Sequence, residues 1–298
     1  MNRGVMMESE IVLHFCRSNR ALALGQHKLY VQGVVNHLFA TFQDVSQDPE
    51  YIVEQEYQKL CNTPVWDDSQ ICGDFDELAE LAWDRGVERF QDLMFVKQQM
   101  MNLATAGLYH LWERTFKSFL ERETNLSGLW LSCLSSKNNQ KELKNGEKSS
   151  VKSGHRITRE EAVRKIRKFR FDEVIEWVKK SNFSKCSEAE SILDGLETLC
   201  LVANTVKHGN GLSCDNIFKK DNDFFVGSAE NKKMFEQIKL SNSDSDRLNE
   251  SLFYETFNRP DADDLWVTEE LFQDFACVVE RFWHTLPERI EIYCGDRL

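Results

Sequence analysis

The chain has 298 residues, of which 37 are Lys or Arg and 49 are Asp or Glu, so its formal net charge is −12. This length allows one large domain or two small ones. With 41% apolar residues, 20 Phe, 7 Trp and only 4 Pro, the chain can bury a core and rarely interrupts its helices. This composition argues against a wholly disordered, collagen-like or all-β protein.

The sequence gives no sign of a membrane segment or a cofactor. No run approaches the ~18 apolar residues of a membrane span, and acids stand near the N-terminus where a signal peptide has its apolar core. The 9 Cys stand singly, which argues against a disulfide framework and a zinc ribbon. Phosphate-loop, dinucleotide, serine-hydrolase and zincin motifs do not occur. We therefore expect a cytoplasmic protein with no metal, no other cofactor and no membrane contact.

Three helical regions are expected in the first 123 residues. Apolar residues recur at three- and four-residue spacing from Ser9 to Phe42, which predicts one long helix with a polar face. A second helix follows Pro49 and ends before Pro64, because proline lacks a backbone donor and disfavours the α conformation in the preceding residue. Residues 74–123 contain no proline, so a long bent helix or two end-to-end helices are expected there.

The middle of the chain is expected to hold a mobile linker and then two helices. Residues 135–156 contain only two aliphatic residues among Lys, Ser, Asn and Gly, and their burial cannot offset the entropy of ordering such a segment. Capping-box spacing at Thr158 and again at Ser187 predicts that helices begin near both positions. The second of these helices is expected to end at Gly209, a natural left-handed C-cap.

The last third is expected to combine a small β element with a final helix. Phe218 to Val226 is read as a β-hairpin. Thr268, followed by two glutamates, predicts the start of a helix whose apolar face ends near Pro287. The fold class predicted from the sequence is therefore all-α with a minor β-hairpin.

The strongest chemical signal lies at the helix end that Gly209 caps. The helix dipole favours the charged form of a histidine in the last turn, and the glycines after His208 let a phosphate approach. Lys207 adds positive charge, and Asn204, one turn earlier, offers a donor and an acceptor on the face of His208. These are components of a phosphodiester-cleaving site. The alternative is structural: Lys207 and His208 cap helix carbonyls, and Gly209 only ends the helix.

A second group of polar residues follows one face of the helix that contains residues 101–123. His110, Glu113, Arg114 and Lys117 have i, i+3, i+4, i+7 spacing and form one stripe. If this stripe faces His208, Arg114 could bind phosphate and Glu113 could orient a cation. The alternative is a solvated helix face on which these charges pair with one another.

Three stretches resemble the HEPN superfamily (higher eukaryotes and prokaryotes nucleotide-binding). They are a helix reading LYHLWERTFKSFLER, a helix ending NTVKHGNG, and a last helix reading DDLWVTEELFQDFACVVERFWHTLPE, and together they span roughly residues 95–290. The resemblance implies an antiparallel helical bundle, and many members are metal-independent endoribonucleases of toxin–antitoxin and antiphage systems. It also implies a homodimer, since such sites usually form where two motif helices meet across a two-fold axis.

The HEPN active-site motif is an arginine, a polar residue directly after it, and a histidine after about four to six residues. Carried over by the resemblance, His208 takes the histidine position and Asn204 the polar position. The arginine position falls on Ala203, and loss of this arginine, which is thought to bind the scissile phosphate, commonly accompanies loss of catalysis. Lys207 and Arg114 are possible substitutes, although an ammonium does not reproduce the fork of a guanidinium.

One stretch of the sequence favours nucleic-acid binding independently of this motif. Residues 137–170 contain 12 basic and 4 acidic residues, whereas the rest of the chain is strongly acidic. Such a segment could gather an RNA or DNA backbone, with Lys165, Arg167 and Lys168 among the phosphate-binding residues. It could also bind an acidic partner or the protein's own acidic surface, or be a solvated charge run.

We therefore expect an N-terminal helical region over residues 1–92 and a HEPN-like bundle over 93–298, with the basic linker at 135–156. Two classes of function stay open. The first is an antiphage or toxin-type effector that cleaves RNA without a metal, with His208, Asn204 and Lys207 as its catalytic residues. The second is a catalytically inert interaction or sensor module that binds a partner protein or nucleic acid in a defence complex.

Overall fold

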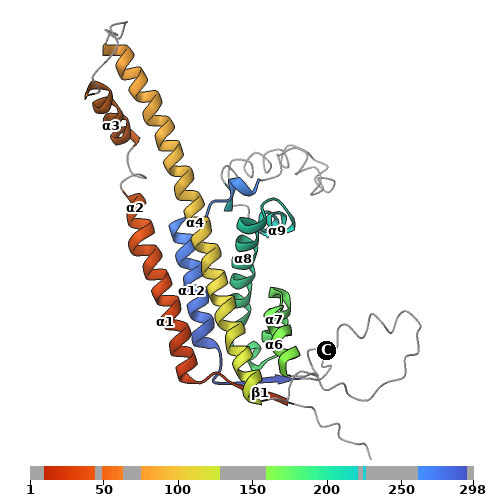
Figure 1. Cartoon of the computed structure of the whole chain (residues 1–298). Coiled ribbons are helices and arrows are strands. Elements are labelled where there is room, and N and C mark those ends of the chain that lie inside the picture. The colour runs from red at the N-terminus through yellow and green to blue at the C-terminus, as the bar shows by residue number, and fades with distance from the viewer. Residues whose placement is uncertain are drawn as a thin grey trace, which may run out of the picture. The chain divides into compact units, whose positions relative to one another are not determined.

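The structure is a computed structural model and describes residues 10–43, 49–62, 75–127, 159–220, 224–225 and 261–293. These residues are mostly helical, with one small antiparallel sheet, so the predicted all-α class is confirmed (Figure 1). The chain divides into two compact units that interleave along the sequence. Unit 1 comprises residues 1–28, 109–200 and 275–298, and unit 2 comprises residues 29–108 and 201–274. Residue 92, after which the sequence suggests a boundary, lies in the helix Phe75–Ser127, whose residues 75–108 belong to unit 2 and whose residues 109–127 belong to unit 1.

The first half of the described chain is helical after one strand. Its elements are β1 (Glu10–His14), α1 (Arg17–Gly33), the π-helix η1 (Val34–Phe39), α2 (Ala40–Gln43), α3 (Pro49–Asn62) and α4 (Phe75–Ser127). The predictions for α3 and for the long helix α4 are confirmed. The helix predicted from Ser9 is wrong at its start, because residues 10–14 form a strand and helical backbone begins only at Arg17.

The second half contains shorter helices and closes with a strand. Its elements are α6 (Arg159–Arg167), α7 (Phe171–Lys179), η3 (Asn182–Lys185), α8 (Ala189–His208), α9 (Leu212–Lys220), η6 (Ala262–Asp264), α12 (Glu269–Thr285) and β2 (Arg289–Tyr293). The helix starts expected near Thr158 and Ser187 agree with α6 and α8. The hairpin predicted over Phe218–Val226 is wrong in its location, because α9 extends to Lys220 and Phe225 forms an isolated bridge with Leu265. The linker predicted at 135–156 lies outside the described residues.

The sheet of unit 1 joins the two ends of the described chain. β1 pairs antiparallel with β2, with His14 opposite Arg289 and Glu10 opposite Tyr293. Beside β2, the side chain of Asn182 donates to the Arg289 carbonyl at 2.9 Å and accepts from the Glu291 amide at 3.1 Å. Backbone groups at this edge are therefore paired, which protects it from pairing with another chain.

Aromatic side chains form the core of unit 1. Trp112 and Phe116 of α4 stack with ring centroids 6.0 Å apart, and the Phe282 ring of α12 meets each of them edge-on at 5.5 Å. Trp112, Phe116 and Phe282 are at most 1% exposed. Phe15 follows β1 and contacts Phe119 edge-on at 5.0 Å. Such pairs contribute beyond the area they bury, so this cluster stabilises unit 1.

Unit 2 is held by close helix packing and by specific hydrogen bonds. Gly86 of α4 lies against Val53 of α3, and a Cβ at position 86 would come within 2.7 Å of the Val53 Cα, so only glycine permits this approach. Tyr30 donates its hydroxyl to the Ala104 carbonyl of α4 at 2.7 Å.

Among the helices that the structure describes, none is long and apolar enough to cross a membrane.

Candidate functional site

The end of α8 has the local geometry that its sequence predicts. Gly209 adopts a left-handed conformation with φ of 68°, and its amide donates to the Thr205 carbonyl at 2.8 Å. This bond is the αL form of helix C-cap, so the capping role of Gly209 is confirmed. Lys207 and His208 are exposed in the last turn, and Asn204 is half-buried one turn earlier.

The side chain of Ala203 is fully buried, with 0% exposure. This is the position onto which the resemblance to the HEPN motif carries the arginine. The adjacent buried residues Val202 and Thr205 are at most 1% exposed. This part of α8 therefore has no room for a long charged side chain that must reach a substrate in solvent.

The residue after the cap has a structural role. The Asn210 amide nitrogen donates to the Asp261 carboxylate at 3.0 Å, and its oxygen accepts from the Ala262 amide at 2.6 Å. The Asp263 amide also donates to Asp261, and these bonds hold the pKa of the Asp261 carboxyl below its usual range. The sequence Gly209-Asn210 is therefore accounted for by a helix cap and by a tether to residues 261–262.

The polar stripe on α4 is largely paired within the helix. Lys117 donates to the Glu113 carboxylate at 2.8 Å, and the His110 imidazole lies 3.6 Å from the same carboxylate. Arg114 is exposed. Residues 110–117 belong to unit 1, whereas Asn204, Lys207 and His208 belong to unit 2. The pairing agrees with the interpretation of this stripe as a charged helix face.

The basic residues expected at a nucleic acid lie on and just after α6. Arg167 makes a bidentate contact with the Glu121 carboxylate of α4, at 3.0 and 3.2 Å, and this carboxylate raises the pKa of the guanidinium. Lys165 and Lys168 are exposed. Arg167 thus has a partner within unit 1, and phosphate binding by it would have to displace Glu121.

Sequence reasoning missed two buried amides on α4. The Gln98 side chain donates to the carbonyls of Asp263 and Leu265 at 2.8 and 2.7 Å. One turn on, Asn102 donates to the Leu265 carbonyl at 2.7 Å and accepts from the Val267 amide at 3.1 Å. These bonds fix the backbone that leads into α12. The available signal was a pair of polar residues at i, i+4 within an apolar helix face.

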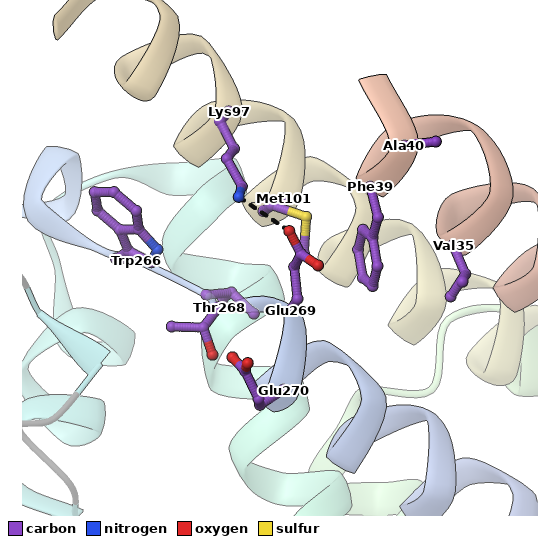
Figure 2. A pocket seen from close by; sticks show the side chains of 10 residues that line it. Val35, Phe39, Ala40, Lys97, Met101, Trp266, Thr268, Glu269 and Glu270 are labelled. Carbon is purple, nitrogen blue, oxygen red and sulfur yellow. Dashed lines mark ion pairs between the residues drawn. The ribbon is translucent and has the colours of Figure 1, made fainter. Parts of the chain in front are cut away.

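This fixed backbone forms one wall of a cavity of about 570 Å³ in unit 2 (Figure 2). The π-helix η1 forms another wall, and π-helical turns are rare and often lie at functional sites. The lining residues are Val35, Phe39, Ala40, Lys97, Met101, Trp266, Val267, Thr268, Glu269 and Glu270. Lys97, whose side chain is 13% exposed, pairs with Glu269 at 2.9 Å across the cavity.

The polar groups of this cavity are used by the fold itself. The Thr268 hydroxyl accepts from the Leu271 amide at 3.2 Å, which caps the start of α12 as the sequence predicts. The backbone amide of Glu270 and the Thr268 hydroxyl lower the pKa of the Glu270 carboxyl. Among the residues that the structure describes, no Cys, His or Ser lines the cavity. Its polar side chains Lys97, Thr268, Glu269 and Glu270 are therefore engaged in an ion pair and in hydrogen bonds at the start of α12.

Within the described part of the chain, no cluster of three or more His, Cys, Asp or Glu is arranged to hold a metal ion. Comparison of the chain with protein-family models, with curated proteins and with solved structures finds no match.

Proposed function

We propose that the chain is a HEPN-like helical interaction module that binds a partner protein or nucleic acid in a defence complex, without cleaving RNA itself. The observation that most strongly supports a function without RNA cleavage is the full burial of Ala203. The arginine of the family motif is thought to bind the scissile phosphate, and a buried methyl group supplies neither charge nor reach. The homodimer that the resemblance implies forms part of this proposal.

Two further observations support an inert module. The glycine and asparagine after His208 are explained by a helix cap and a tether, so they need no substrate. Lys207 is exposed and can attract phosphate, but an ammonium is a point charge and does not grip two phosphate oxygens as a guanidinium does. Weak binding of an anion at this helix end therefore does not amount to catalysis.

One observation favours a metal-independent ribonuclease as the second candidate. Asn204 and His208 stand one turn apart on α8, and His208 is exposed where a substrate can reach it. In that case His208 would act as general acid or base while a ribose 2′-OH attacks the adjacent phosphate. Asn204 and Lys207 would stabilise the charge on the phosphate.

Growth of cells that express the chain separates these two functions. We expect the wild type, His208→Ala and His284→Ala to slow growth equally or not at all, because the module has no catalytic histidine. His284 is the matched control, since it is also exposed in the last turn of a helix. A toxic wild type that His208→Ala makes harmless, while His284→Ala stays toxic, would favour the ribonuclease.

A further inference from the structure

A groove between α7 and α8 in unit 1 has an apolar floor. Its volume is about 670 Å³, and its floor consists of Phe171, Ile175, Ala189 and Leu193. Phe171 is half-buried, and the other three are 4 to 7% exposed. The floor therefore offers apolar surface at the bottom of an open depression.

Both rims of this groove are acidic. Glu190, Asp194 and Glu197 follow one face of α8 at i, i+4, i+7, and Asp172 and Glu176 follow α7 at i, i+4. Lys179 is the one basic residue among the described residues that line the groove. Glu176 also pairs with Lys180 at 3.0 Å, an exposed contact of the kind that contributes little. The described lining of the groove thus contains five carboxylates and one ammonium.

We propose that this groove binds a basic amphipathic helix of a partner protein. Such a helix would place apolar residues at i, i+3/i+4 and i+7 on the floor, with Lys or Arg flanking them toward both acidic rims. We choose a basic helix as the partner because its charge is complementary to that of the groove. Carboxylates along both rims attract cationic side chains and repel a phosphate backbone. The proposal rests on the function as an interaction module and names the class of partner.

The chain's own basic segment fits this groove less well. Residues 135–156 carry many lysines but only two aliphatic residues, Leu143 and Val151, so they cannot cover an apolar floor of four residues. A partner helix supplies both the charge and the apolar face. The segment of residues 135–156 is therefore an alternative occupant of the groove, and the experiment must compare its binding with that of a partner helix.

The test is binding of a labelled amphipathic peptide to the full chain, measured by fluorescence anisotropy. The probe is a helix of about 15 residues with leucines on one face and lysines on its flanks. We expect Glu190→Gln/Asp194→Asn/Glu197→Gln to weaken binding at least about tenfold, and we expect high salt to weaken wild-type binding. The matched control, Asp84→Asn/Glu88→Gln/Asp92→Asn, neutralises three exposed acids along one face of α4 and should change affinity less than about twofold.

Two further peptides, a scrambled control and a peptide of the chain's own residues 137–156, complete the design. A scrambled peptide of the same composition should bind weakly, because it cannot present an apolar face and basic flanks together. Equal loss of affinity in both triple variants would overturn the proposal, and so would tighter binding by a peptide of residues 137–156 than by the amphipathic probe. RNA cleavage by the wild type would instead overturn the proposed function and leave the peptide result unaffected.

Discussion

Replacing Ala203 with arginine is expected to lower the free energy of unfolding by at least about 3 kcal/mol. The side chain is 0% exposed, so the longer residue must displace packed neighbours and take a charge out of water. The variant restores the arginine of the HEPN motif in sequence, but it cannot place that arginine at a substrate. Urea unfolding followed by far-UV circular dichroism measures the loss.

Two further variants keep this result interpretable. Ala203→Leu adds volume without charge and should cost about 1–3 kcal/mol, which gives a measurable value if the arginine variant does not fold. Lys207→Arg, on the exposed face of the same helix, should change stability by less than about 0.5 kcal/mol. An Ala203→Arg variant that is as stable as the wild type would contradict the burial of residue 203. If that variant also cleaved RNA, it would contradict the proposed function as well.

Replacing Trp112 with alanine is expected to cost about 3–5 kcal/mol of unfolding free energy. The Trp112 ring contacts Tyr109, Phe116 and Phe282, and it is 1% exposed. Truncation leaves a cavity at the centre of the aromatic cluster of unit 1. Its indole N–H is buried without a hydrogen-bond partner among the described residues, so Trp112→Phe should cost clearly less than the alanine variant.

The control for this prediction is a second tryptophan of α4. Trp83 is 54% exposed, so Trp83→Ala should change the free energy of unfolding by less than about 0.5 kcal/mol. Both variants are compared with the wild type by urea unfolding. Equal losses for Trp83→Ala and Trp112→Ala would contradict the assignment of Trp112 to the core.

The helices could be predicted from sequence because their signals are local. Pro49 and Pro64 predict the start and the end of α3, and a long stretch without proline predicts α4. Ser187 predicts the start of α8, and Gly209 predicts its end. The strand β1 could not be predicted in this way, because its partner β2 lies at the other end of the described chain. Residues 10–14 are a short apolar run whose spacing also fits a helix, and only the distant pairing decides between the two.

The site was harder to predict than the fold. The conformation of Gly209 followed from sequence, but the role of Asn210 depends on residues 261–262, about fifty positions away. The hydrogen bonds from the side chains of Gln98 and Asn102 likewise depend on the Leu265 carbonyl, which is distant in sequence and comes close only in the tertiary fold. The acidic groove joins two helix faces that carry no shared motif, so spacing within either helix alone does not reveal it.

The most direct test of the interaction-module function is an RNA-cleavage assay with the purified full chain. Single-stranded RNA is incubated with the protein in EDTA, which leaves attack by a 2′-OH possible while removing divalent ions. The products are separated on a denaturing gel, with His208→Ala and His284→Ala beside the wild type. We expect intact RNA with all three proteins. Cleavage by the wild type and by His284→Ala that leaves 2′,3′-cyclic phosphate ends, and that His208→Ala abolishes, would contradict the proposal.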